Sequence, residues 1–223
     1  MTQTPFWLES LFGLITFLTL ILFLRSTKET KNVLLFSLPW LIVTALAALS
    51  GITQVTTAPP RLLFLLLIPV SAIILLFSTS RGRKFIDALD PARLTLIHVI
   101  RIPVEIVLFL LFLKGTVAEI ITFEGRNYDI LAGISAPLIY YFGFRKKLIG
   151  RKGLILWNIL CLVLLFNVVI HAVLTVPYPF QQLAFDQPTI AVLYFPFVWL
   201  PAYVVPVVLF SHLATLRSLS RQS

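Results

Sequence analysis

The stretch LIHVIRIPVEIV, residues 96–107, places three ionisable side chains among apolar residues: His98, Arg101 and Glu105. They are separated by three and then four positions, so on an α-helix they project from one face. An imidazole and a carboxylate can exchange a proton, and a guanidinium can bind an anionic group or pair with a carboxylate. The spacing therefore predicts a polar site on one helix face, with Arg101 and Glu105 placed to pair with each other.

The energetic cost of these groups indicates that the polar face lies inside the protein. A charged side chain near the bilayer centre costs about 2.5–3.5 kcal/mol on the insertion scale, whereas each aliphatic or Phe residue returns about 0.3–0.6 kcal/mol. For residues 94–113, the total cost of the charged side chains nearly equals the total gain from the apolar ones. The polar face of this helix must therefore point toward other helices or a wet cavity. Two explanations remain: a structural clasp, or a site for a substrate, an ion or a proton. We favour the site, because Ser, Thr or small-residue packing would make a structural tie at lower cost.

The apolar run 153–176 contains a second set of polar side chains, and Asn158 lies near its start. Asn167 and His171 are four positions apart, in the outer half of this run, and could meet the Glu105 end of the first set. A neutral buried histidine with one hydrogen-bond partner is the commoner explanation for a residue such as His171. The predicted substrate or proton site therefore comprises His98, Arg101, Glu105, Asn167 and His171.

No cofactor is predicted, although two histidines keep one alternative open. His98 and His212 are expected at a similar depth in the membrane, where bis-histidine ligation could hold one haem between them. The three histidines fall on three different apolar runs without the ligand spacing of a zinc site, so no metal site is predicted. The late runs contain no interior lysine for a retinal Schiff base, and the single cysteine, Cys161, excludes a disulfide framework.

Apolar runs long enough to cross a bilayer must position these side chains. Of the 223 residues, 59% are hydrophobic and only 12% are charged, about half the charged share of a soluble domain. Because the first run has no basic region before it and no small-residue cleavage site after it, we expect a retained helix rather than a signal peptide. The sequence predicts an all-α fold in a single transmembrane domain, residues 1–223. Its seven-helix bundle has spans at about 5–24, 33–52, 62–78, 94–114, 128–144, 153–176 and 189–215.

Basic residues are distributed unevenly between the two sides of these spans. Fourteen Lys and Arg residues lie in alternate connections and the tail, whereas three lie on the other side. Short loops rich in Lys and Arg stay cytoplasmic, which predicts an outside N-terminus and a cytoplasmic C-terminus in a bacterial-type cytoplasmic (inner) membrane. Topology and contact with anionic lipid headgroups then account for the net charge of +9 without a nucleic-acid partner. The fourteen are Arg25, Lys28, Lys31, Arg81, Arg83, Lys84, Arg93, Arg145, Lys146, Lys147, Arg151, Lys152, Arg217 and Arg221.

Two outer connections and the last span have a distinctive composition. Residues 115–129 mix apolar and charged side chains, and residues 177–189 are rich in aromatics, amides and prolines. We expect both to fold back over the outer mouth of the bundle; the alternative is an interfacial aromatic belt. Three prolines in the last span predict a kinked or broken helix. They are Pro196, Pro201 and Pro206.

The predicted outer gate belongs to the first of the two connections, residues 115–129. It comprises Glu124, Arg126, Asn127 and Asp129.

Three classes of function fit these observations. We expect a small transporter or permease-like protein whose polar site on the fourth span binds a small solute or exchanges a proton. The alternative is a non-catalytic accessory or structural subunit that docks a partner membrane subunit through its polar face. A haem- or quinone-linked redox protein is the third class. The chain contains no G-x-S-x-G elbow and no phosphate-binding glycine loop, so an enzymatic activity is not expected.

Overall fold

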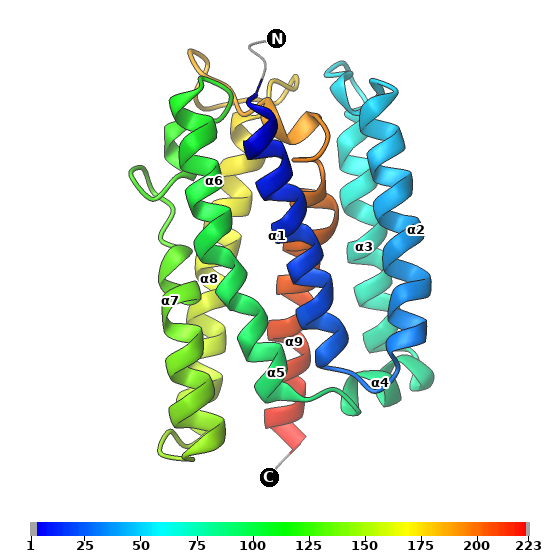
Figure 1. The fold of residues 1–223 in the computed structure, drawn as a ribbon, viewed down its shortest axis with the longest axis vertical. Coiled ribbons are helices and arrows are strands. Elements are labelled where there is room, and N and C mark those ends of the chain that lie inside the picture. Colours follow the sequence, from blue (N-terminus) through cyan, green and yellow to red (C-terminus); the bar gives the residue numbers. More distant parts are fainter. Residues whose placement is uncertain (1–3, 222–223) are drawn as a thin grey trace.

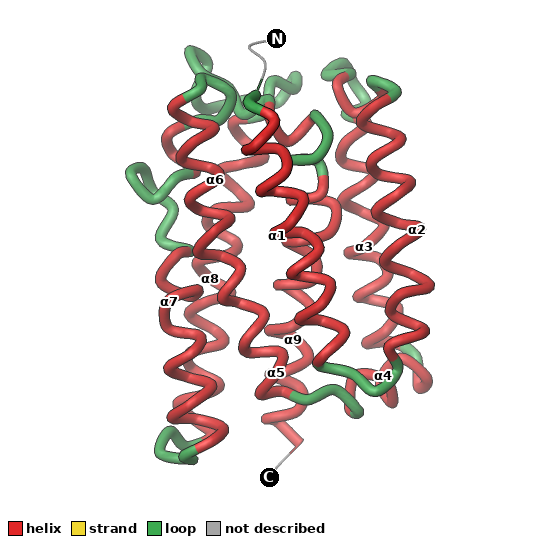
Figure 2. The backbone as a smooth tube through the Cα atoms, viewed as in Figure 1, coloured by secondary structure: helices red, strands yellow, loops and turns green. Residues whose placement is uncertain are grey.

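The computed structural model describes residues 4–221. These residues form helices joined by short connections and contain no β-strand, which confirms the predicted all-α fold (Figure 1, Figure 2). Within these residues, six helices are long and apolar enough to cross a membrane, which indicates a membrane protein. They are α1 (Phe6–Arg25), α2 (Thr30–Leu49), α3 (Arg61–Ser78), the Pro91–Leu113 helix that contains α5 (Pro91–Ile97) and α6 (Arg101–Leu113), α8 (Arg151–Thr175), and the Leu200–Arg221 helix that contains α9 (Val205–Arg221).

A further apolar helix, at the predicted span 128–144, is shorter than the other six. α7 (Ile130–Ile139) has 10 residues and continues into a 6-residue π-helical turn, Tyr140–Arg145. At 1.5 Å per residue, these 16 residues extend over about 24 Å, less than the roughly 30 Å of hydrocarbon in a bilayer. The chain that precedes α7 must therefore cover the remaining depth if this segment crosses a membrane.

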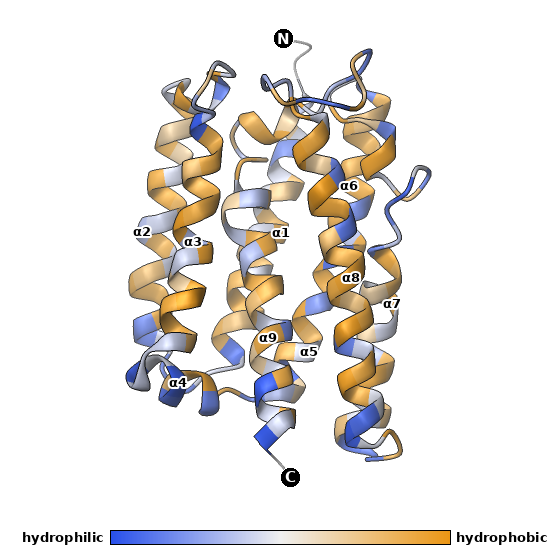
Figure 3. Ribbon diagram, turned by 180° about the vertical axis from the view of Figure 1, so that it is seen from behind, coloured by the Kyte–Doolittle hydropathy of each residue, from blue (hydrophilic) through white to orange (hydrophobic). Residues whose placement is uncertain are grey.

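Successive long helices run in opposite directions along one common axis (Figure 1). α1 packs against α2, α5 and α6, and α9 packs against α5 and α8. The Pro91–Leu113 and Leu200–Arg221 helices are the most buried of the six long helices, so they form the centre of the bundle. α1 starts at one end of the bundle and α9 finishes at the opposite end, which we call the C-terminal end, and the connections that hold the basic residues lie at the C-terminal end (Figure 1). Hydrophobic residues occupy the middle of the helices, with hydrophilic residues gathered near their ends (Figure 3).

The last predicted span, 189–215, is broken as its prolines predicted. Its first part, residues 189–199, contains only a short 3-10 turn at Ala191–Leu193. The helix begins at Leu200 with a π-helical turn, Leu200–Val204, and continues as α9. Proline has no backbone N–H to donate to a preceding turn, which explains why the regular helix starts later than hydrophobicity alone predicted.

Hydrogen bonds from two indole groups attach the α2–α3 hairpin to this broken segment. Trp40 Nε1 donates to the Ala202 carbonyl at 2.9 Å, and Trp199 Nε1 donates to the Leu41 carbonyl at 3.0 Å. Thr53, beyond the end of α2, donates to the Leu193 carbonyl at 2.6 Å. The Ala202 and Leu193 carbonyls of the broken segment thus receive donors from α2 and from the turn that follows it, as the membrane interior requires.

A short helix ties two distant parts of the chain at the C-terminal end of the bundle. α4 (Ser80–Asp87) starts where the Thr79 hydroxyl accepts a bond from the Gly82 amide at 3.2 Å, a standard N-cap. Asp87, its last residue, accepts hydrogen bonds from Arg217 Nε at 2.8 Å and Nη2 at 3.1 Å, and also pairs with Arg221. The Arg217 guanidinium holds the pKa of Asp87 below its usual value of 3.8.

Candidate functional site

The polar site begins on a helix whose start is fixed by a strong capping signal. Pro91 occupies the first turn of α5, and the Asp90 carboxylate accepts a hydrogen bond from the Ala92 amide at 2.9 Å. A short 3-10 turn, His98–Ile100, then joins α5 to α6. This junction sets the direction in which Arg101, the first residue of α6, enters the bundle. Arg101 and Glu105 are only 3% and 2% exposed, so the polar face is turned inward.

The connection between α6 and α7 re-enters the bundle instead of closing over its outer mouth. From the end of α6 the chain runs back alongside this helix to about mid-height, where α7 begins (Figure 1). Asn127 Nδ2 donates to Glu105 Oε1 at 2.6 Å and to the Ile121 carbonyl at 2.9 Å. Asn127 Oδ1 in turn accepts from the Asp129 amide at 2.9 Å. We call residues 114–129 the re-entrant segment.

This path corrects the predicted outer gate, because two of its four residues belong to the site itself. Asn127 is fully buried and Asp129 is 5% exposed, whereas Glu124 and Arg126 are exposed. Gly125 lies in the tight turn between Glu124 and Arg126. A Cβ at this position would collide with the backbone of Glu119, so only glycine fits.

Arg101 forms the centre of a buried hydrogen-bond network. Its Nη1 donates to Asp129 Oδ1 at 2.9 Å, and its Nη2 lies 3.1 Å from His212 Nε2. Because a guanidinium has only donors, His212 Nε2 must accept, which places the imidazole proton on Nδ1. Nδ1 can then donate to Asn158 Oδ1, which lies 2.8 Å away. The network thus fixes His212 as a neutral imidazole with one defined tautomer.

The pairing predicted between Arg101 and Glu105 is wrong. The salt bridge of Arg101 is with Asp129, and the re-entrant segment supplies Asn127 as the partner of Glu105. Within residues 4–221, Glu105 Oε2 and Arg101 Nε have no hydrogen-bond partner. Each group is therefore held on one side by a residue of the re-entrant segment and keeps one polar atom free.

His98 packs against this network without joining it through hydrogen bonds. Its ring stacks on that of His212, with centroids 3.7 Å apart and planes inclined by 15°, and Trp157 flanks both rings. Both His98 ring nitrogens lack a partner in the described part of the chain. Two imidazoles in direct face-to-face contact leave no space for a porphyrin plane between them. The arrangement of His98 and His212 therefore does not fit a bis-histidine haem site.

The predicted polar stripe on α8 is placed differently from the expectation. Asn167 Nδ2 donates to the Arg126 carbonyl at 2.7 Å, and His171 Nδ1 lies 2.8 Å from the Asn167 carbonyl of its own helix. Both side chains bond to backbone carbonyls rather than to Glu105. α8 instead contributes Asn158, whose Nδ2 also donates to the Leu154 carbonyl at 2.9 Å.

α7 can approach Arg101 closely because it presents a glycine at the contact. A Cβ on Gly133 would lie 2.8 Å from Ile102 Cγ1 and 3.3 Å from Arg101 Cβ. Small residues of this kind allow two membrane helices to pack closely. The close contact keeps Asp129, just before α7, within reach of the guanidinium.

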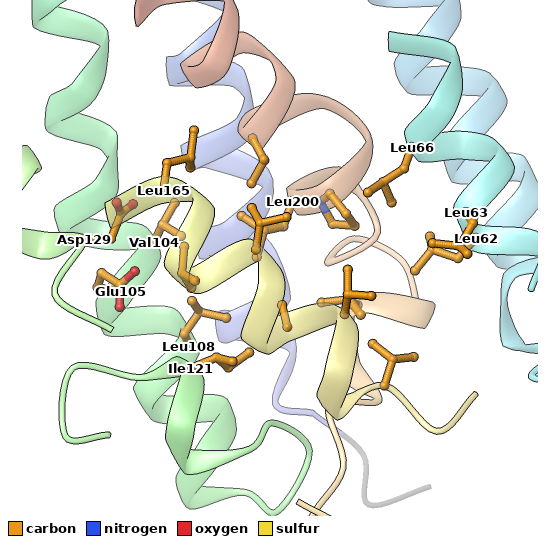
Figure 4. Close-up of a pocket in the computed structure, with 18 of the residues that line it drawn as sticks. Leu62, Leu63, Leu66, Val104, Glu105, Leu108, Ile121, Asp129, Leu165 and Leu200 are labelled. Carbon is orange, nitrogen blue, oxygen red and sulfur yellow. The ribbon is translucent and has the colours of Figure 1, made fainter. Parts of the chain in front are cut away.

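A cavity of about 110 Å³ borders the acidic part of the site. Glu105 and Asp129 lie together at one part of its wall, and the remaining lining is almost entirely apolar (Figure 4). The lining comes from α3, α6, α8 and the Leu200–Val204 turn, which are distant in sequence. Glu105 is therefore adjacent to open volume as well as to Asn127.

Sequence reasoning identified Asn127 and Asp129 as functional candidates but placed them at the outer mouth. One signal could have corrected this placement: the apolar run after Asp129 ends at the basic residues from Arg145, which leaves about 24 Å of helix. Such a short run must begin inside the membrane rather than at its surface. Comparison with protein-family models, with curated proteins and with solved structures gave no match to this chain.

Proposed function

We propose that the protein is a small permease-like transporter of the cytoplasmic membrane that exchanges protons at Glu105. The observation that carries this proposal is the state of the Glu105 carboxyl group. It is 2% exposed, borders a cavity and keeps Oε2 without a hydrogen-bond partner in the described chain. A purely structural carboxyl group would have both oxygens satisfied, because an unpartnered buried polar atom is costly.

The charge of the site supports a proton-exchanging role. Counted as ionised groups, Arg101, Asp129 and Glu105 sum to −1, and Arg101 already pairs with Asp129. An uncompensated charge in a low-dielectric interior is strongly unfavourable. The site therefore favours the uptake of one positive charge, and a proton on Glu105 provides it in the absence of a solute.

The surrounding network holds the two carboxyl groups in different environments. Arg101 pairs with Asp129, and His212 and Asn158 fix the guanidinium from the other side. Asn127 donates one hydrogen bond to Glu105, which either protonation state of the carboxyl group accepts. Asp129 thus remains the fixed counter-charge of Arg101, and Glu105 is the group that changes its charge.

The proposed topology has seven membrane segments, with the N-terminus outside and the C-terminus in the cytoplasm. Two features support it. The start of α1 and the end of α9 lie at opposite ends of the bundle, as an odd number of crossings requires, and the basic connections lie at the C-terminal end (Figure 1). In this topology the re-entrant segment and α7 together make one crossing.

The rival function, an accessory subunit that docks a partner through the polar face of α6, has less support. Arg101 and Glu105 are covered by residues of their own chain, so this face is not free for another helix. The same enclosure is what a transport site within one chain requires.

A test of the function uses inside-out vesicles in which respiration or ATP hydrolysis has formed a pH gradient. Solutes of different classes, namely inorganic cations, organic amines, carboxylates and sugars, are added while a fluorescent dye reports the gradient. We expect one class to collapse the gradient with the wild-type protein but not with Glu105→Gln. Glu124→Gln, an exposed acid of the re-entrant segment, is the matched control and retains the response. If no class acts, or if Glu105→Gln responds as the wild type does, proton exchange at Glu105 is ruled out.

A further inference from the structure

We propose that the solute of this site is a lipophilic monoamine, an ammonium group attached to a small apolar body that exchanges with the Glu105 proton. This inference rests on the proposed function and names its substrate class. It follows from three properties of the cavity: its lining, its charge and its position in the bundle.

The lining favours an apolar body. Apart from Glu105 and Asp129, the wall is formed almost entirely by aliphatic side chains, including Leu62, Leu66, Val104, Leu108, Val169 and Leu200 (Figure 4). A sugar would need several hydrogen-bonding groups, and the wall does not provide them. An apolar cavity of about 150 Å³ accommodates benzene, so a volume of 110 Å³ suits an apolar group smaller than a benzene ring.

The charge favours one cationic group rather than an anion or a metal ion. With Asp129 committed to Arg101, Glu105 is the carboxylate without a charged partner, and its buried Oε2 has no hydrogen-bond partner within residues 4–221. Calcium needs six to eight oxygen ligands and magnesium an octahedral set. An ammonium group has up to three N–H donors and can be satisfied by one carboxylate together with nearby carbonyl oxygens.

The position of the cavity favours a solute that partitions into the bilayer. α3 and α8 form two of its walls, and they are the two least buried of the six long helices. A molecule in the bilayer therefore meets the cavity between these helices without crossing the aqueous mouth. This route suits an amine with an apolar body and does not suit a strongly hydrated ion.

The exchange step balances one proton against one cation. In the resting site Glu105 is protonated, with its O–H proton as the compensating positive charge. When the amine binds as its ammonium form, the O–H bond breaks and the proton leaves to the aqueous phase. The ammonium N–H groups then donate to the Glu105 carboxylate, so the total charge of the site is unchanged.

The test measures binding of radiolabelled isobutylammonium to the full chain in nanodiscs, with isobutanol as the neutral analogue of similar shape. We expect isobutylammonium to bind about ten times more tightly than isobutanol and to release about one proton in weakly buffered solution. Glu105→Gln should lose this preference and the proton release while still binding isobutanol. Glu124→Gln should behave like the wild type.

A second variant keeps the result interpretable if Glu105→Gln fails to fold. Val169→Phe fills the cavity without touching a charged residue and should weaken the binding of both ligands. Equal binding of isobutylammonium and isobutanol to the wild type would overturn the proposal, and so would isobutylammonium binding that is unaffected by Val169→Phe.

Failure of this inference can be separated from failure of the proposed function. If another class of solute collapses the pH gradient through Glu105 while isobutylammonium does not bind, proton exchange stands and the amine assignment is wrong. If isobutylammonium binds at Glu105 but no solute collapses the gradient, the site is a receptor site rather than a transport site.

Discussion

Arg101 pairs with Asp129, a residue 28 positions further along the chain, and not with Glu105, which lies one helical turn away on its own helix. The nearer carboxyl group is thereby left with Asn127 as its partner and with one oxygen free. Two acids that look equivalent in sequence thus acquire different roles, one as a fixed counter-ion and one as a group next to open volume. The re-entrant segment creates this difference, because it supplies both Asn127 and Asp129.

Removing the counter-ion of Arg101 should destabilise the bundle strongly. Asp129→Ala leaves a buried guanidinium without its paired charge, which typically costs 3–5 kcal/mol. We expect a clear loss of thermal stability of the purified protein in detergent. The exposed Asp186→Ala is the matched control and should change stability by less than about 0.5 kcal/mol. If Asp129→Ala is as stable as Asp186→Ala, the Arg101–Asp129 salt bridge contributes nothing to the stability of the fold.

The two stacked histidines should respond differently to the same substitution. His98→Phe keeps a flat ring on His212 and removes nitrogens that have no partner in the described chain, so we expect a change below about 1 kcal/mol. His212→Phe leaves an Arg101 N–H group and the side-chain oxygen Oδ1 of Asn158 unsatisfied, which should cost about 1–3 kcal/mol. The measurement is the unfolding of both purified variants under the same conditions. If His98→Phe were less stable than His212→Phe, the assigned hydrogen-bond network would be wrong.

The contact between α4 and the C-terminal helix should weaken in acid. The pKa of Asp87 is lowered in the folded protein by its hydrogen bond with Arg217, so the contact is fully formed above the usual aspartate pKa of 3.8. Its stabilising effect is lost as the pH falls through the lowered folded-state pKa. Hydrogen exchange of α4 amides should therefore accelerate only in this acidic range, and Asp87→Asn should show the faster exchange at neutral pH. Unchanged exchange in Asp87→Asn would show that the contact does not hold α4.

The proposed orientation can be measured by labelling single cysteines. The native cysteine, Cys161, is buried and is first replaced in a Cys161→Ser background. Glu124→Cys should react with a membrane-impermeant maleimide added outside intact cells, whereas Lys147→Cys should react only after the membrane is opened. Labelling of Lys147→Cys in intact cells would reverse the proposed topology.

Hydrophobic periodicity and length predicted the all-α fold and the approximate spans, because a membrane helix must be apolar over a fixed length. The inward orientation of Arg101 and Glu105 followed from the cost of exposing charges to lipid. Their actual partners could not be predicted, because the return of residues 114–129 toward mid-height depends on packing against α6. Tertiary contacts of this kind leave only a weak trace in a single sequence, here the shortness of the α7 run.

The order of synthesis gives the network one more property. His212, which holds Arg101 from the side opposite Asp129, follows it by 111 positions and belongs to the last helix. A nascent chain that has inserted α6 therefore holds an incompletely satisfied guanidinium until α9 emerges from the ribosome. Final assembly of the bundle must wait for its C-terminal helix, and chains truncated before this helix should be recognised as substrates by membrane quality-control proteases.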